Sequence, residues 1–311
     1  MEDVGVGIKR ITFPLPFELD HVHCYLLPGD DGWTLVDCGI GYPGLAEQWR
    51  ELLAPLDQPV LRIVITHFHP DHVGGAADAA AATGASVHQG VLDHEQCERV
   101  WGSPDWEGRL AGWFRRVGVP DEVSAGLQAA GAALRPLIRF PAAPEPLHPG
   151  DTVDGWLVEA FPGHADGHLC LFRDGVMIAG DHLLPRISPT IGLYPDARPD
   201  PLGDYLGSLE RTVALGPRLA LPGHGDPISD PAARAGELIE HHRDRLDRLE
   251  AELGRTPRTG YDLSLALFGD DLRYSQRRFA VAETLAHCER LVFADRAARA
   301  DDGRSLSYTA A

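Results

Sequence analysis

The feature that most constrains this chain is a cluster of histidine and aspartate directly behind a strongly apolar run. Residues 61–67 read LRIVITH, a β-branched stretch typical of a buried strand, and the chain continues as FHPDH. A strand end that turns tightly aims neighbouring side chains to one side. His67 and His69 can then reach one metal ion, while Asp71 and His72 can reach a second. Imidazole and carboxylate groups suit zinc, and also iron or manganese.

Two metal ions need more ligands than these four residues, and three later segments offer them. PGHADGH contains His164, IAGDH places Asp181 at the end of an apolar strand, and ALPGHGDP places His224 behind another. Because loops at one end of a sheet converge, we expect these side chains to meet the first four. An aspartate between two histidine-rich sites is well suited to bridge two ions. His168 is left outside the ligand set, because a structural hydrogen bond explains it about as well.

Strands and helices alternate along the first part of the chain, which is typical of a layered α/β domain. Two strands are expected around the turn PGDDG, a helix over residues 45–53, and later strands at GWLVEAF, HLCLF, VMIAG and RLALPG. Residues 93–147 break this rhythm and are expected to form a helical cap inserted into a domain of residues 1–232. Residues 236–311 then read as three helices and a short hairpin. They predict a second, small helical or winged-helix-like domain.

Composition narrows the classes of partner. The net charge is −18, from 28 basic and 46 acidic residues, and such a surface repels nucleic-acid backbones and anionic lipid. We therefore expect a small-molecule substrate, with no nucleic-acid or membrane partner. The five cysteines are scattered and form no CxxC pair, which argues against a disulfide framework. With no signal peptide and no membrane-spanning run in the sequence, we expect a cytoplasmic protein.

The candidate ligands occur in the order and spacing of a known family. In chain order they are His67, His69, Asp71, His72, His164, Asp181 and His224. This series resembles the metallo-β-lactamase superfamily over about residues 1–232. The resemblance implies an αββα sandwich with the metal ions at one edge. The helical tail is similar to the extra C-terminal domain carried by one branch of that family.

The resemblance also assigns roles to the ligands. It implies a first metal ion on His67, His69 and His164. It implies a second ion on Asp71, His72 and His224, with Asp181 as the bridge between the two ions. Asp37, in LVDCG, matches the early strand-end aspartate with which the family supports its metal loop. The two ions are expected to be Zn²⁺, with iron or manganese as alternatives.

The bridging Asp181 is similar to that of the glyoxalase II, lactonase and acyl-thioesterase branches. The leading hypothesis is therefore hydrolysis of an acyl bond in a thioester, lactone or other ester. Two metal ions lower the pKa of a bound water, and Asp71 is expected to orient the resulting hydroxide toward a carbonyl. No serine nucleophile in a GxSxG elbow is present. Three alternatives stay open: a phosphodiesterase or nuclease, iron-dependent oxygen or sulfur chemistry, and a non-catalytic binding module on the same fold.

The inserted segment is rich in aromatic side chains, namely Trp101, Trp106, Trp113 and Phe114. These side chains can form the apolar wall of a substrate pocket, which predicts a substrate with an apolar part. The alternative is that they pack the helices onto the body of the domain. Given the acidity of the chain, the C-terminal tail is expected to serve packing or homodimerisation rather than DNA binding.

Overall fold

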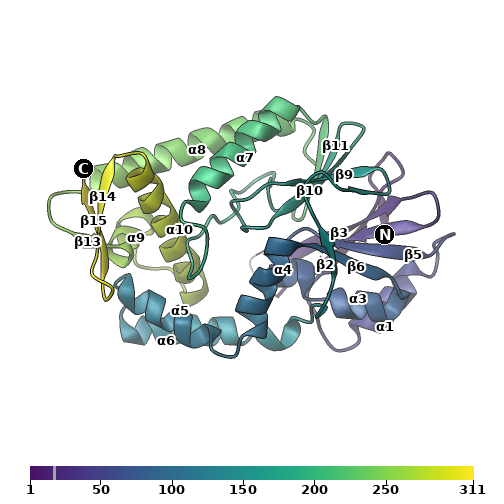
Figure 1. Ribbon diagram of the computed structural model, residues 1–311, viewed down its shortest axis with the longest axis horizontal. Coiled ribbons are helices and arrows are strands. Elements are labelled where there is room, and N and C mark those ends of the chain that lie inside the picture. Colours follow the sequence, from purple (N-terminus) through teal and green to yellow (C-terminus); the bar gives the residue numbers. More distant parts are fainter. Residues whose placement is uncertain (17–18) are drawn as a thin grey trace.

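The computed structural model describes residues 1–16 and 19–311. Within this part of the chain the strands form sheets of seven, five and three strands (Figure 1). The first sheet runs in the order β1 (Glu2–Asp3), β2 (Lys9–Pro14), β3 (His21–Pro28), β4 (Trp33–Val36), β5 (Val60–Ile65), β6 (Ser86–Gly90) and β7 (Glu145–Leu147). The second sheet runs in the order β12 (Leu219–Pro222), β11 (Val176–Gly180), β10 (Leu169–Arg173), β9 (Trp156–Ala160) and β8 (Thr152–Val153).

The first two sheets pack face to face, and helices cover their outer faces. In β11 the side chains of Val176 and Ile178 belong to the core between the sheets, whereas those of Met177 and Ala179 belong to the core beneath the helices. This alternation follows from the two-residue period of a strand. Burial on both faces explains why such strands read as continuous apolar runs.

Two groups of helices complete the sandwich. α1 (Leu45–Leu53) and α3 (Ala76–Thr83) pack against each other beside the first sheet, and α7 (Pro201–Leu215) packs against the second. The αββα architecture predicted from the sequence is therefore confirmed, as is the helix expected over residues 45–53. None of the helices in residues 1–16 and 19–311 is long and apolar enough to cross a membrane. All five cysteines are buried and free.

The segment expected as a helical cap is largely helical. It contains α4 (Val91–Cys97), the π-helix η1 (Glu98–Gly102), α5 (Trp106–Arg116), α6 (Asp121–Ala132) and the 3₁₀-helix η2 (Arg135–Leu137). Its last residues instead form β7, which pairs in parallel with β6 and widens the first sheet.

The aromatic side chains of this segment serve packing. Trp106 and Phe114 are buried in the core beneath the helices, and Trp113 packs against that core. Trp101 also packs there, and its Nε1–H donates a 2.8 Å hydrogen bond to the carbonyl of Phe68. The structure thus supports the packing alternative for these side chains.

The chain ends in a small C-terminal domain. It is built from α8 (Pro231–Glu252), α9 (Gly260–Phe268) and α10 (Tyr274–Phe293), with the sheet β13 (Arg258–Thr259), β15 (Leu306–Ala310) and β14 (Ala297–Asp301). Figure 1 shows this domain at the end of the molecule opposite the two large sheets. The predicted boundary at residue 236 falls inside α8, which runs unbroken along α7.

Buried imidazoles lie where α7, α8 and α10 meet. His242 Nδ1 lies 3.1 Å from His287 Nε2, and His287 Nδ1–H donates to the carbonyl of Glu283. The ring of Tyr205, on α7, packs edge-on 5.5 Å from the ring of His242. Burial lowers the pKa of His242 to about 2 and that of His287 to about 3. Both rings are therefore neutral in the folded protein near pH 7.

These buried rings predict how stability depends on pH. In the unfolded chain these two histidines bind protons once the pH falls below about 6.5, whereas in the folded chain they stay neutral. Their contribution to the free energy of unfolding therefore decreases as the pH falls from about 6.5 toward 3. Each such histidine contributes a loss of about 1.4 kcal/mol between pH 7.5 and pH 5.5. Urea unfolding of the metal-free His242→Phe variant should therefore show a loss in the free energy of unfolding that is about 1.4 kcal/mol smaller than in the unaltered chain. His148→Phe, at an exposed position, should keep the full loss; an equal loss in all three proteins would contradict the prediction.

Candidate metal centre

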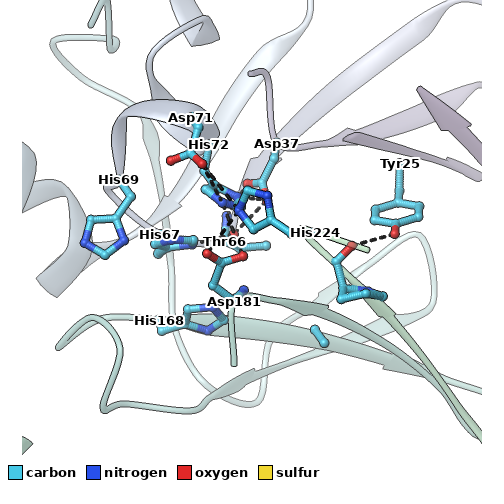
Figure 2. Close-up of polar contacts among 12 residues, drawn as sticks. Tyr25, Asp37, Thr66, His67, His69, Asp71, His72, His168, Asp181 and His224 are labelled. Carbon is cyan, nitrogen blue, oxygen red and sulfur yellow. Dashed lines mark hydrogen bonds and ion pairs between the residues drawn. The ribbon is translucent and has the colours of Figure 1, made fainter. Parts of the chain in front are cut away.

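Strand ends from both large sheets meet at one edge of the sandwich. The first sheet supplies the side chains that follow β5 and lie on α2 (Pro70–Val73), namely His67, His69, Asp71 and His72. The second sheet supplies those that follow β9, β11 and β12, namely His164, Asp181 and His224. Figure 2 shows Asp181 pointing from the second sheet toward His72 and His224. All seven predicted ligands are thus brought together.

The side chains fall into groups of the size that a metal ion needs. In the described part of the chain these groups are His67, His69 and His164; His67, His72 and Asp181; and Asp71, His72 and His224. The ligand atoms of each group lie within 4.8 Å of one another. His69 Nδ1 lies only 2.8 Å from His164 Nε2, so His69 faces the centre through Nδ1. The first and last groups match the two ligand sets predicted from the sequence.

Asp181 lies between the two sets. Its Oδ2 is 3.6 Å from His164 Nε2 and 3.3 Å from His224 Nε2, and its Oδ1 is 3.4 Å from His72 Nε2. One carboxylate therefore reaches ligands of both sets. That is the position a bridging ligand requires.

Hydrogen bonds fix the tautomers of the histidines in the first loop. Asp37 accepts at Oδ2 from the Thr66 hydroxyl and from His72 Nδ1–H, both at 2.8 Å. Because its own hydrogen is directed at Asp37, Thr66 Oγ1 can only accept from Nδ1–H of His67, at 3.0 Å. In its neutral form, each imidazole therefore has its Nε2 lone pair directed at the centre and free to bind a metal.

The later histidines are oriented by backbone carbonyls. His164 Nδ1–H donates to the carbonyl of Thr190 at 2.8 Å, and His224 Nδ1–H donates to the carbonyl of His21 at 2.6 Å. Their Nε2 atoms then also point inward as lone pairs. Neither carbonyl could be identified from the sequence, because any residue type supplies one.

Four of the inward-facing atoms lack a hydrogen-bond partner among the described residues. In the described part of the chain, His67 Nε2, His72 Nε2, His224 Nε2 and Asp181 Oδ1 are buried without a hydrogen-bond partner. Buried polar atoms left unpaired are costly, and a cluster of them needs a reason. Imidazole nitrogens converging with carboxylate oxygens are the donor set of zinc and related ions. The residues present therefore fit a pair of metal ions.

Electrostatics favour cations at this point. Burial opposes a charge on His224, but Asp181 and Asp71 raise its pKa to about 10. Burial likewise opposes a charge on His72, yet Asp181, Asp37 and Asp71 raise its pKa well above the usual value. For Asp71, burial works against ionisation, whereas His72 and His224 lower its pKa to about 2. The carboxylates of the centre are thus ionised, and their negative charge stabilises positive charge on the groups between them.

Asp37 and Asp93 both support the metal-binding loop, but the sequence indicates only Asp37. Asp37 was expected to support the metal loop, and it does so from a left-handed backbone position, φ 60°. Asp93 was missed. Its buried carboxylate accepts from the backbone N–H of Phe68 at 2.8 Å and from Gln89 Nε2 at 2.6 Å, and so holds the loop between His67 and His69. Asp93 lies in the inserted segment, where no sequence signal links it to the loop.

Comparisons with known proteins agree with this geometry. Residues 18–224 match the metallo-β-lactamase superfamily, and residues 246–310 match the metallo-β-lactamase-like C-terminal domain. The chain is 29% identical over 304 residues to the probable metallo-hydrolase YqjP of Bacillus subtilis. The alignment covers 91% of each protein.

Solved structures show the same relationship along the full chain. A metallo-β-lactamase family protein from Thermus thermophilus is 35% identical, with a TM-score of 0.85, over 99% of this chain and 100% of that one. A β-lactamase domain protein from Burkholderia ambifaria is 30% identical, with a TM-score of 0.87, over 100% of this chain and 94% of that one. The chain therefore belongs to the metallo-β-lactamase superfamily and carries the histidine and aspartate clusters of a dinuclear metallo-hydrolase.

Proposed function

We propose that this metallo-hydrolase cleaves an acyl bond, in a thioester, lactone or other ester, at two metal ions. The observation that carries the proposal is Asp181, whose carboxylate lies within 3.6 Å of ligand nitrogens from both sets. A carboxylate in that position neutralises both ions and keeps them close. Two closely spaced metal ions suit attack by water on a carbonyl.

The bound ions would supply Lewis acidity, which ionises water near neutral pH and stabilises the oxyanion that develops on the substrate. The protein supplies the remaining parts. His67, His69 and His164 would hold the first ion, and Asp71, His72 and His224 the second. The side chain of Asp71 is 15% exposed, and its Oδ2 lies 3.3 Å from His224 Nε2. It is thereby placed to orient the attacking water.

We propose Zn²⁺ as the native ion, because neutral imidazoles and carboxylates are its usual ligands in hydrolytic sites. Iron and manganese accept the same donor set. Elemental analysis of protein purified with and without air separates the three. The net charge of −18 argues against a phosphodiester substrate, since phosphate binding normally requires a basic surface.

A substrate panel tests the proposal. Metal-loaded protein should hydrolyse acyl thioesters, lactones or aryl esters faster than bis(p-nitrophenyl) phosphate. Asp181→Ala should retain fewer than two ions and lose at least about a hundredfold in rate, because removing the bridge leaves the ion charges uncompensated. Asp244→Ala, at an exposed carboxylate on α8, should keep two ions and the full rate. Cleavage of the phosphodiester alone, or full activity of the Asp181→Ala variant, would contradict the proposal.

A further inference from the structure

A cavity of about 450 Å³ lies beside the metal centre and has His224 in its wall. Its other walls come from β2, from the start of β3, from the loop after Asp181 and from the loop after β12. We call it the His224 pocket. Its volume lies in the range that small-molecule sites occupy. A ligand in this pocket would lie near His224, one of the predicted metal ligands.

Two of the apolar side chains that line this pocket are exposed to solvent. Ile187 is 48% exposed and Leu19 is 37% exposed, and both line the His224 pocket. Leu184 and Pro185 extend the same apolar wall next to Ile187. Exposed apolar side chains gathered around a cavity mark a surface that a ligand covers.

The charged side chains of the pocket are already paired. Arg10 donates to Glu2 at 2.6 Å, and Arg186 donates to Asp226 at 3.0 Å. Each cation thus has a carboxylate beside it, which reduces the net positive charge of the pocket walls. The pocket can therefore accept an uncharged ligand.

The histidines of the pocket are also engaged. His21 donates from Nδ1–H to Asp20 and accepts the backbone N–H of Gly225 at Nε2. His23 donates from Nε2–H to the carbonyl of Gly225 and accepts the Thr12 hydroxyl at Nδ1. Burial lowers the pKa of His23 to about 4, so that ring adds no charge near pH 7. What the pocket offers a ligand is mainly its apolar wall.

We propose that the His224 pocket binds the apolar acyl chain of the substrate, and that Ile187 favours long chains over short ones. The inference rests on the proposed acyl-bond hydrolysis and adds the chemical class of the acyl group. It keeps the apolar substrate predicted from the sequence but moves its binding site. The aromatic side chains of the insertion pack in or against the core, whereas the exposed apolar wall lies beside His224.

The Ile187→Ser variant tests this assignment with decanoyl and acetyl thioesters. Loss of the apolar contact should lower kcat/KM for the decanoyl substrate about tenfold and leave that for the acetyl substrate within about twofold. Val213→Ser is the matched control, because Val213 is also branched and 45% exposed but lies on α7 outside the pocket. Both variants should retain two metal ions.

Binding of 1-octanol to the metal-free protein gives a second readout that needs no catalysis. Calorimetry should show saturable binding to the unaltered chain and to Val213→Ser, and at least about fivefold weaker binding to Ile187→Ser. An unchanged decanoyl-to-acetyl ratio in Ile187→Ser overturns the pocket assignment while leaving acyl hydrolysis intact. If no acyl substrate is cleaved, the proposed function fails, and octanol binding then shows separately whether the pocket is apolar.

A different observation concerns His168, which belongs to neither ligand set. Its ring is fully buried and stacks on that of His67, with centroids 4.8 Å apart and planes 27° apart. Its Nε2 accepts the backbone N–H of Asp181 at 3.1 Å, and its Nδ1 faces Cys170 Sγ at 3.8 Å. With both nitrogens engaged, the ring touches a ligand of the first set and the bridging residue without facing the metals itself.

The backbone is adapted to this contact. Gly180 has φ 49°, and a Cβ at that position would lie 2.8 Å from His168 Nε2. We infer that His168 is a positioning residue, which holds the bridging carboxylate of Asp181 through its N–H and fixes the plane of His67 by stacking.

Two variants separate these contacts. His168→Gln can keep the acceptor for Asp181 N–H, whereas His168→Phe keeps a ring and loses the acceptor. In competition with a chromophoric chelator, His168→Phe should bind Zn²⁺ about tenfold to a hundredfold more weakly than the unaltered chain. His168→Gln should restore most of that affinity and the visible spectrum of the Co²⁺-loaded protein.

A purely structural role would instead lower the melting temperature of the metal-free protein equally in both variants, with no rescue of metal affinity by glutamine. That result, or unchanged affinity in His168→Phe, overturns the inference. If His168→Phe does not fold, His168→Leu replaces it, and rescue by glutamine is judged against that variant.

Discussion

The metal centre depends on the buried carboxylate of Asp37. Its Oδ1 accepts the backbone N–H of Thr66, and its Oδ2 accepts the Thr66 hydroxyl and His72 Nδ1–H, each at 2.8 Å. One side chain thereby fixes the end of β5, the tautomer of His72 and, through Thr66, the tautomer of His67. Asp37 directly follows β4, and its backbone has a left-handed conformation whose cost the surrounding hydrogen bonds offset.

The two sheets must also be held in register for the ligand sets to meet. Tyr25, on β3, donates its hydroxyl to the carbonyl of Pro222 at 2.6 Å (Figure 2). The backbone N–H of His23 donates to the carbonyl of Gly223 at 2.7 Å. These bonds join the first sheet to Pro222, the last residue of β12, and to Gly223, the residue directly before His224. The position of that ligand is thus set by contacts between the sheets, which explains why the centre lies at their shared edge.

Metal binding and folding share the same electrostatics at this edge. Asp37, Asp71 and Asp181 place three carboxylates in a region of low dielectric, where unpaired charge is costly. Imidazoles raised in pKa compensate them in the metal-free protein. Divalent ions compensate them without protons, so occupancy of the centre and stability of the surrounding loops are linked.

The sequence by itself determined a layered α/β domain and the candidate ligands, because apolar runs ending in histidine or aspartate reveal both a buried strand and the side chain at its end. The αββα arrangement followed from the resemblance to the family. The sequence also anticipated the support given by Asp37, through a resemblance in the motif LVDCG. Only the tertiary structure showed that Asp93, Thr190 and His21 orient the ligands, since two of these act through carbonyls that any residue has. The tertiary structure likewise decided that the insertion aromatics pack inward and that an apolar pocket lies beside His224. Side-chain type predicts burial, but which surface remains open depends on how distant segments pack together.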